Sequence, residues 1–233
     1  MTRYTDLVAW AGPRECTLRE QFFGHTNPYV ESDDLTDFRS RGAGFRHELI
    51  VLRCFSYGDN DEAMGIIITT RTLLRNVVYT VIGQDDHGVV ASADGTYKLH
   101  RGGWSVVNFG TYAVHLNHRQ FRQTFVPWAC MFVRSELYET YTAIFTTIRT
   151  TVKEFFNIDL NIAFGSLDHS DAIANAFLTE WSVIKLMNCW PHFVRKANEN
   201  ERRLLNNSER GKMYCFRLLI GFTKLVQQNS SQR

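Results

Sequence analysis

The sequence has no apolar run that approaches the roughly 20 residues needed to span a bilayer. Residues 1–10 lack the basic and then apolar pattern of a secretory signal peptide. The five cysteines are odd in number and widely separated, which argues against a disulfide framework and favours reduced thiols. These absences predict a chain with no membrane partner that resides in the nucleus or the cytoplasm.

Several catalytic and metal-binding motifs are also missing. The sequence has no Walker loop, no G-x-G-x-x-G fingerprint and no Ser/His/Asp motif. Cys189 and His192 have the spacing of half a zinc site, but no second pair completes it. His115 and His118, three positions apart, are more typical of a strand end than of a metal site. We therefore expect no bound zinc and no small-molecule substrate.

The residues that are present favour one packed core with an uneven charge. Hydrophobic residues make up 44% of the 233 and aromatic residues 13%, which suits a globular domain. Residues 1–65 carry 7 Lys and Arg against 11 Asp and Glu, whereas residues 181–233 carry 10 against 3. Such a basic end attracts nucleic acid. The alternative interpretation of this basic stretch is a solvent-exposed helix followed by a frayed tail.

Periodicity divides the chain into three parts. Residues 1–65 show no sustained period and form a segment of unclear structure, residues 66–197 form the predicted core, and residues 198–233 form a basic helical tail. The core elements are predicted as a helix capped by Thr69 or Thr70 and ending at Gly83, strands over 89–93, 105–115 and 125–133, a long helix after Ser135, a strand over 158–167, a helix over 170–181 and a strand over 183–189. The long helix is predicted from an apolar stripe that begins at Leu137, with Glu136 and Glu139 in its first turn. Pro127 predicts an edge position or a bulge in its strand.

Three consecutive strands followed by strand–helix–strand units predict a mixed α/β (α+β) fold. We expect an antiparallel meander that continues into parallel crossovers, giving a five-stranded mixed sheet flanked by helices. This is the element order of the ribonuclease H-like fold.

Asp94 and Asp168 stand where the first and the fourth predicted strands stop. In the ribonuclease H-like fold the first and fourth strands are neighbours, about 4.8 Å apart. The two carboxylates at their ends can therefore hold divalent ions about 3.5–4 Å apart for phosphoryl transfer. Mg²⁺ or Mn²⁺ suits oxygen ligands. Each residue also has a simpler interpretation, because Asp94-Gly95 is a common hairpin turn and Asp168 can cap the helix near Ser170. Asp171 competes for the second role, but it falls inside the first helical turn.

Three ordered segments resemble the Mutator-like (MULE) transposases. The stretch Ala93-Asp-Gly-Thr-Tyr-Lys-Leu99, followed by Gly-Gly-Trp, resembles the first-aspartate motif of that family. Gly165-Ser-Leu-Asp-His-Ser-Asp-Ala-Ile-Ala-Asn-Ala176 resembles its second-aspartate strand and helix. Cys189-Trp-Pro-His192 resembles the C-x-x-H motif that follows. The resemblance spans roughly residues 65–197.

The resemblance implies a DDE-type enzyme that nicks DNA at element ends and joins the freed 3′-hydroxyl to target DNA. It implies Asp94 and Asp168 as metal-binding catalytic carboxylates for Mg²⁺ or Mn²⁺, and Cys189 and His192 as supporting residues. DNA is the implied partner, and self-association as a homo-oligomer is left open.

The third acid of that family lies on a helix far beyond the C-x-x-H motif. After His192 the sequence contains only Glu199, Glu201 and Glu209 as acids, all in a highly charged stretch. The sequence therefore predicts a transposase core that is truncated before its third carboxylate and inactive by itself. The alternative is a non-catalytic DNA-binding or interaction module derived from a transposase.

Overall fold

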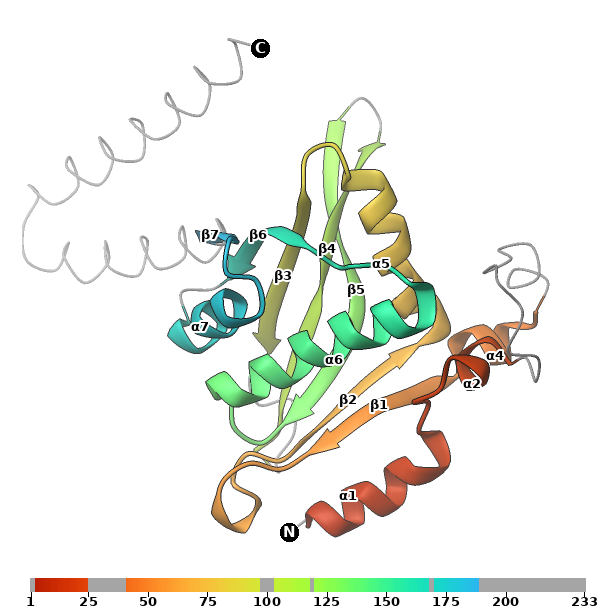
Figure 1. Cartoon of the computed structure of the whole chain (residues 1–233), viewed down its shortest axis with the longest axis vertical. Helices are drawn as coiled ribbons and strands as arrows, with labels where there is room; N and C mark the ends of the chain where they lie inside the picture. The colour runs from red at the N-terminus through yellow and green to blue at the C-terminus, as the bar shows by residue number, and fades with distance from the viewer. Residues whose placement is uncertain (1–2, 25–40, 97–102, 118–119, 168–169, 189–233) are drawn as a thin grey trace, which may run out of the picture. The chain divides into compact units, whose positions relative to one another are not determined.

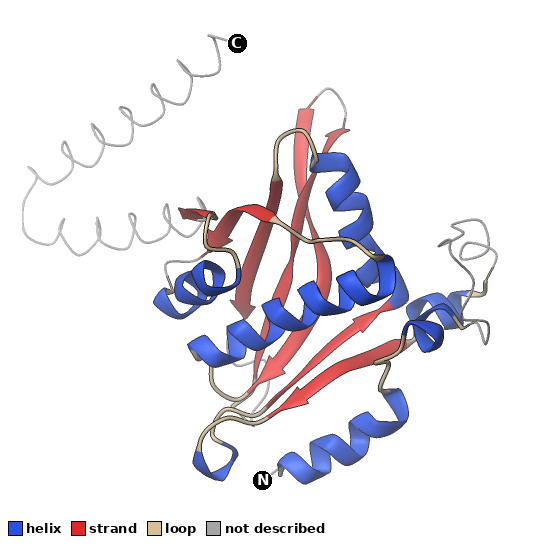
Figure 2. Ribbon diagram, viewed as in Figure 1, coloured by secondary structure: helices blue, strands red, loops and turns tan. Residues whose placement is uncertain are grey.

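The structure, a computed structural model, describes residues 3–24, 41–96, 103–117, 120–167 and 170–188. All of them except Asn188 belong to one compact unit, Met1–Met187. The unit is built around a seven-stranded mixed sheet with the order β1-β2-β5-β4-β3-β6-β7 (Figure 1). Helices pack against this sheet (Figure 2), so the fold is mixed α/β.

The strands are β1 (Leu49–Phe55), β2 (Gly65–Thr70), β3 (Val89–Thr96), β4 (Ser105–Asn117), β5 (Gln120–Val133), β6 (Ile162–Leu167) and β7 (Lys185–Asn188). The α-helices are α1 (Tyr4–Ala11), α2 (Arg19–Phe23), α4 (Ala43–His47), α5 (Arg71–Gln84), α6 (Tyr138–Phe156) and α7 (Asp171–Glu180). Two short 3₁₀ turns, η1 (Gly12–Arg14) and η2 (Asp59–Asp61), complete the described elements. None of the described helices is long and apolar enough to cross a membrane.

The prediction of five strands was wrong, because β1 and β2 extend the sheet from a segment whose structure the sequence left unclear. Both strands are covered on two faces: Ile67 packs in the main core, whereas Ile66 joins Ala11 of α1 and Val51 in a second cluster. Strands buried on both faces carry continuous apolar runs instead of an alternating pattern. The division drawn at residue 65 falls inside β2, so strands from both sides of it share one sheet.

The predicted antiparallel meander is confirmed in β3, β4 and β5, and β6 runs parallel to β3. Pro127 does not lie in an edge strand, since β5 is placed between β2 and β4. It does lie at a bulge, where the β4–β5 register shifts after Phe109 and Gly110 pairs with Pro127. The bulge accommodates a residue that has no N–H to donate.

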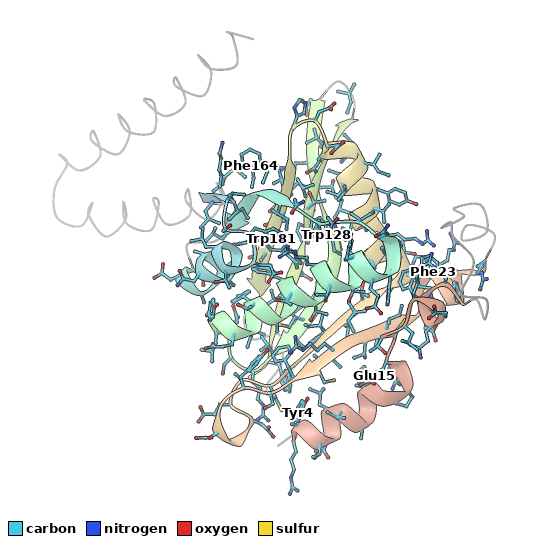
Figure 3. The ribbon with its side chains drawn as sticks, in the orientation of Figure 1. Tyr4, Glu15, Phe23, Trp128, Phe164 and Trp181 are labelled. Atoms are coloured by element: carbon cyan, nitrogen blue, oxygen red, sulfur yellow. The ribbon has the colours of Figure 1, made fainter. Side chains whose placement is uncertain are left out.

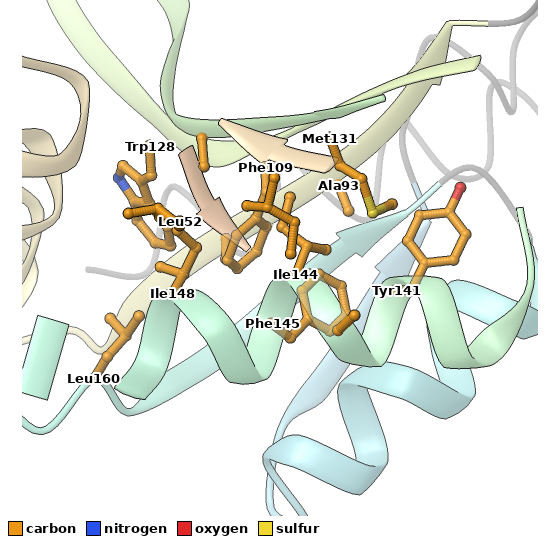
Figure 4. Close-up of a cluster of buried hydrophobic side chains, with 14 of the residues drawn as sticks. Leu52, Ala93, Phe109, Trp128, Met131, Tyr141, Ile144, Phe145, Ile148 and Leu160 are labelled. Atoms are coloured by element: carbon orange, nitrogen blue, oxygen red, sulfur yellow. The ribbon is translucent and has the colours of Figure 1, made fainter. Parts of the chain in front are cut away.

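The helix α6 closes the main core. Its predicted apolar stripe is buried: Tyr141, Ile144, Phe145, Ile148, Val152 and Phe155 are each at most 1% exposed. Phe145 stacks on Phe177 of α7 with ring centroids 4.3 Å apart. It also lies beside Phe109 of β4, with ring centroids 4.7 Å apart (Figure 4). Leu137, which was predicted to start this stripe, is the N-cap and is 45% exposed.

One local prediction at a helix end is confirmed. The Thr70 hydroxyl caps α5 by accepting a hydrogen bond from the Leu73 amide at 3.1 Å. Asn157 ends α6 in the left-handed conformation, with φ of 55°. The chain then remains irregular until Ile162, so β6 begins later than predicted, and the indole of Trp181 donates to the Leu160 carbonyl at 2.8 Å (Figure 3).

Candidate active site

Asp94 lies within β3, in the middle of the sheet. It pairs with Asn108 of β4, and the strand continues through Gly95 to Thr96. The hairpin-turn interpretation of Asp94-Gly95 is therefore wrong, as is the prediction that the strand stops at Asp94. Asp94 is an exposed residue.

Asp168 lies outside the described residues, directly after the last residue of β6. The strand that leads to it is the parallel neighbour of β3, with Ser92 opposite Ser166. The alternative role for Asp168 as a helix cap is not borne out, because Ser170 holds the N-cap position of α7. Asp171 is the first residue of that helix, as the sequence predicted, and it is exposed.

Glu136 packs on β3 beside the candidate site, on the face of the sheet opposite the side chain of Asp94. We expected it in the first turn of a helix, but α6 begins at Tyr138 and Glu136 lies in the connection from β5. Its carboxylate lies against Gly95, the residue after Asp94: a Cβ built on Gly95 would come within 2.6 Å of the Glu136 Oε2 atom. A glycine at this position is what permits the close approach.

The two oxygens of the Glu136 carboxylate differ in their partners. The Tyr141 hydroxyl donates a 2.6 Å hydrogen bond to Oε2. The Oε1 atom is buried and has no hydrogen-bond partner among the described residues. A buried carboxylate oxygen without a donor is costly and is therefore uncommon.

A polar pair lies beside Asp94 on β4 and β5. The Cys130 thiol donates to the Asn108 Oδ1 atom at 3.1 Å, and Asn108 is the cross-strand neighbour of Asp94. Burial raises the pKa of Cys130 above the usual value for a thiol, so the sulfur stays protonated and acts as the donor. The pair orients the Asn108 amide next to the aspartate.

The remaining predicted site residues are not brought into this site by the described structure. Cys189, His192 and His118 lie outside the described residues, and His115 is exposed near the far end of β4. Cys16, Cys54 and Cys130 are free thiols, in agreement with the expectation of reduced cysteines. Within the described ranges, no group of three or more His, Cys, Asp or Glu side chains is close enough to hold a metal ion.

The Asp94 carboxylate is chemically suited to a hard divalent cation, because Mg²⁺ and Mn²⁺ prefer oxygen ligands. Glu136 does not share this position, because it contacts Gly95 on the α6 face of β3 and the side chain of Asp94 points to the other face. No protein-family model and no curated protein sequence matches the chain.

Proposed function

We propose that the chain is the ribonuclease H-like core of a DDE-type DNA transposase of the Mutator-like kind, with Asp94 and Asp168 as its metal-binding carboxylates. The observation that carries this proposal is the parallel pairing of β3 with β6. Ser92 and Ser166 are opposite each other, and each aspartate follows its own serine by two positions in the sequence. A continued register would place the two carboxylates side by side.

The order of the strands supports the same proposal. If β3 is counted as the first strand, β7 is the fifth. The five strands then lie side by side in the order β5-β4-β3-β6-β7, which is third, second, first, fourth, fifth. The first three are antiparallel and the fourth is parallel to the first. This agrees with the ribonuclease H-like fold, in which the first and fourth strands are neighbours. In this proposal β1 and β2 are an addition to the outer edge of that sheet.

Asp94 and Asp168 would hold Mg²⁺ or Mn²⁺, which would activate an attacking water or 3′-hydroxyl and stabilise the leaving oxygen in phosphoryl transfer. The protein itself contributes the alignment, because β4 holds Asp94 through its pairing with Asn108. Glu136 stays outside this ligand set, since it contacts Gly95 on the opposite face of β3.

Calorimetric titration with Mn²⁺ tests the proposed site. We expect the wild-type chain to bind Mn²⁺ and the Asp94→Asn/Asp168→Asn double variant to lose binding. Asp171→Asn is the matched control, because Asp171 is exposed at the start of α7; it should bind as the wild type does. A folded wild type that binds no Mn²⁺ would contradict the proposal.

Nicking of supercoiled plasmid DNA in Mn²⁺ tests the reaction itself. Activity that is lost with Asp94→Asn supports a polynucleotidyl transferase. A chain that binds DNA but neither binds Mn²⁺ nor nicks would instead be the non-catalytic DNA-binding module that the sequence left as the alternative.

A further inference from the structure

A row of directly opposite residues crosses the sheet at Asp94. Asp94 of β3 pairs with Asn108 of β4, and Asn108 pairs in turn with Cys130 of β5. Residues that are directly opposite each other in neighbouring strands point to the same face of the sheet. Asp94, Asn108 and Cys130 therefore share one face, with Asn108 in the middle.

The helices of the main core lie on the other face. Phe109, the residue after Asn108, packs on Phe145 of α6 with ring centroids 4.7 Å apart. Side chains alternate between the faces of a strand, so Asn108 points away from α6. The Thr111 hydroxyl, on the same face as Phe109, accepts a hydrogen bond from Gln84 of α5 at 3.2 Å. Both α5 and α6 are thus on the side opposite Asn108 (Figure 2).

The face of Asn108 is open over β3, β4 and β5 in the described part of the chain. The helix α1 packs on this face, but it does so over β1 and β2, where Ala11 contacts Ile66. Asp94 is exposed, and Asn108 and Cys130 are each only partly buried. A ligand that approaches the sheet from this side therefore meets the row directly.

The two ends of the Asn108 amide differ in their partners. Its Oδ1 atom accepts a hydrogen bond from the Cys130 thiol at 3.1 Å. Its Nδ2 atom makes no hydrogen bond to a described residue and is not buried. Because the bond to Cys130 holds the oxygen on the β5 side, the nitrogen is turned toward the β3 side, where Asp94 lies. Burial raises the pKa of the Cys130 thiol, so the thiol keeps its proton and remains the donor.

An amide nitrogen in this position is suited to a phosphate oxygen. It donates hydrogen bonds and carries no charge, and asparagine is among the side chains that contact DNA phosphates. A lysine or arginine here would pair with Asp94 and compete with a divalent cation for the carboxylate. The neutral donor avoids that competition, so a metal ion and the amide can bind the same phosphate group.

We propose that Asn108 binds the DNA phosphate group at Asp94 by donating from Nδ2 to a non-bridging oxygen, and that Cys130 is a positioning residue for this amide. The inference rests on the proposed function, because it names a substrate-binding residue of the same site. The contact is to the DNA backbone, so it positions the substrate and is independent of base sequence. It requires the metal ion, because without a cation the negative charge of Asp94 repels the phosphate.

Fluorescence anisotropy with labelled duplex DNA tests the contact, using the full chain in Ca²⁺ and again in EDTA. Ca²⁺ takes carboxylate oxygens as Mg²⁺ does. Asn108→Ala should weaken DNA binding in Ca²⁺ by about tenfold, the low end for a hydrogen bond to a charged group, and should bind like the wild type in EDTA. The matched control is Asn157→Gly, which removes an exposed amide at the end of α6 and keeps the left-handed backbone there. It should bind like the wild type in both buffers.

Further variants separate a phosphate contact from a structural role. Asn108→Asp replaces the donor by a carboxylate, so DNA binding in Ca²⁺ should fall by more than about tenfold, while calorimetry without DNA shows Mn²⁺ bound at least as tightly as by the wild type. Cys130→Ala lets the amide take both orientations and should weaken DNA binding in Ca²⁺ by about twofold. Cys130→Ser keeps a donor and should restore the wild-type affinity. Thermal melting in EDTA verifies that each variant is folded.

Equal affinities in Ca²⁺ for Asn108→Ala, Asn157→Gly and the wild type would overturn the inference. So would a loss in Asn108→Ala that is as large in EDTA as in Ca²⁺, or a folded wild type that binds no duplex in Ca²⁺. Failure of the proposed function is distinguishable, because a wild type that never nicks DNA but shows the Asn108 effect would reject the transferase and keep the phosphate contact. Nicking that needs Asp94 and not Asn108 would keep the transferase and overturn the contact.

Discussion

Gly95→Ala tests the contact between Glu136 and β3. The added methyl group would come within 2.6 Å of the Glu136 Oε2 atom, closer than two such atoms can pack. Glu136 has to move, and the movement breaks the 2.6 Å hydrogen bond from the Tyr141 hydroxyl. A hydrogen bond to a charged group contributes about 1.5–3 kcal/mol. Alanine in a strand regains about 0.5–1 kcal/mol over glycine, so the net loss should be about 1–2 kcal/mol.

A double-mutant cycle isolates this contact from other effects of the alanine. In a Glu136→Ala background the methyl group meets no carboxylate, and Gly95→Ala should then stabilise the chain by about 0.5–1 kcal/mol. The coupling energy should equal the hydrogen bond that is broken, about 1.5–3 kcal/mol. Tyr141→Phe is the second control, because it removes the same hydrogen bond without altering β3.

Urea denaturation followed by tryptophan fluorescence measures these free energies, with EDTA present so that metal binding does not contribute. An equal loss of stability with and without Glu136 would refute the reasoning, since the cost would then come from the strand and not from the carboxylate.

Asp94→Asn should leave the metal-free unfolding free energy nearly unchanged, because removing a carboxylate charge from an empty metal site relieves repulsion; a large drop in thermal stability would favour a structural role. Phe145→Ala should cost about 3–5 kcal/mol, because the ring is fully buried among Phe109 and Phe177, and urea denaturation checks this. Burial raises the pKa of the Cys16 thiol in the folded chain to about 11. The stability that this shift contributes is complete below the pKa of the thiol in the unfolded chain, and it is lost as the pH rises through about 11. Stability should therefore fall more steeply over that interval in the wild type than in Cys16→Ala.

The sequence predicted the elements whose signals are local. The period of α6, the Thr70 cap of α5 and the alternation of β4 and β5 each lie within one short stretch, and all are present in the structure. The bulge at Pro127 follows in the same way from the missing N–H of proline. The parallel placement of β6 beside β3 follows from the crossover through a helix.

Tertiary contacts decided the rest. β1 and β2 have no alternating pattern because α1 and the main core cover both of their faces, so they could be assigned only once those layers were assembled. The turn preference of Asp94-Gly95 was overridden by pairing with β4, since strand formation depends on neighbours more than on intrinsic propensity.

What the sequence determined about the candidate site is the identity of Asp94 and its place in the first strand of the meander. What only the tertiary structure decided is the position of Glu136, which is far from Gly95 in sequence and yet packs its carboxylate on it. No periodicity or motif encodes such an approach, because it depends on how the connection before α6 crosses the end of β3. The physical reason is that local signals specify elements, whereas a contact between side chains of two elements exists only after they have packed.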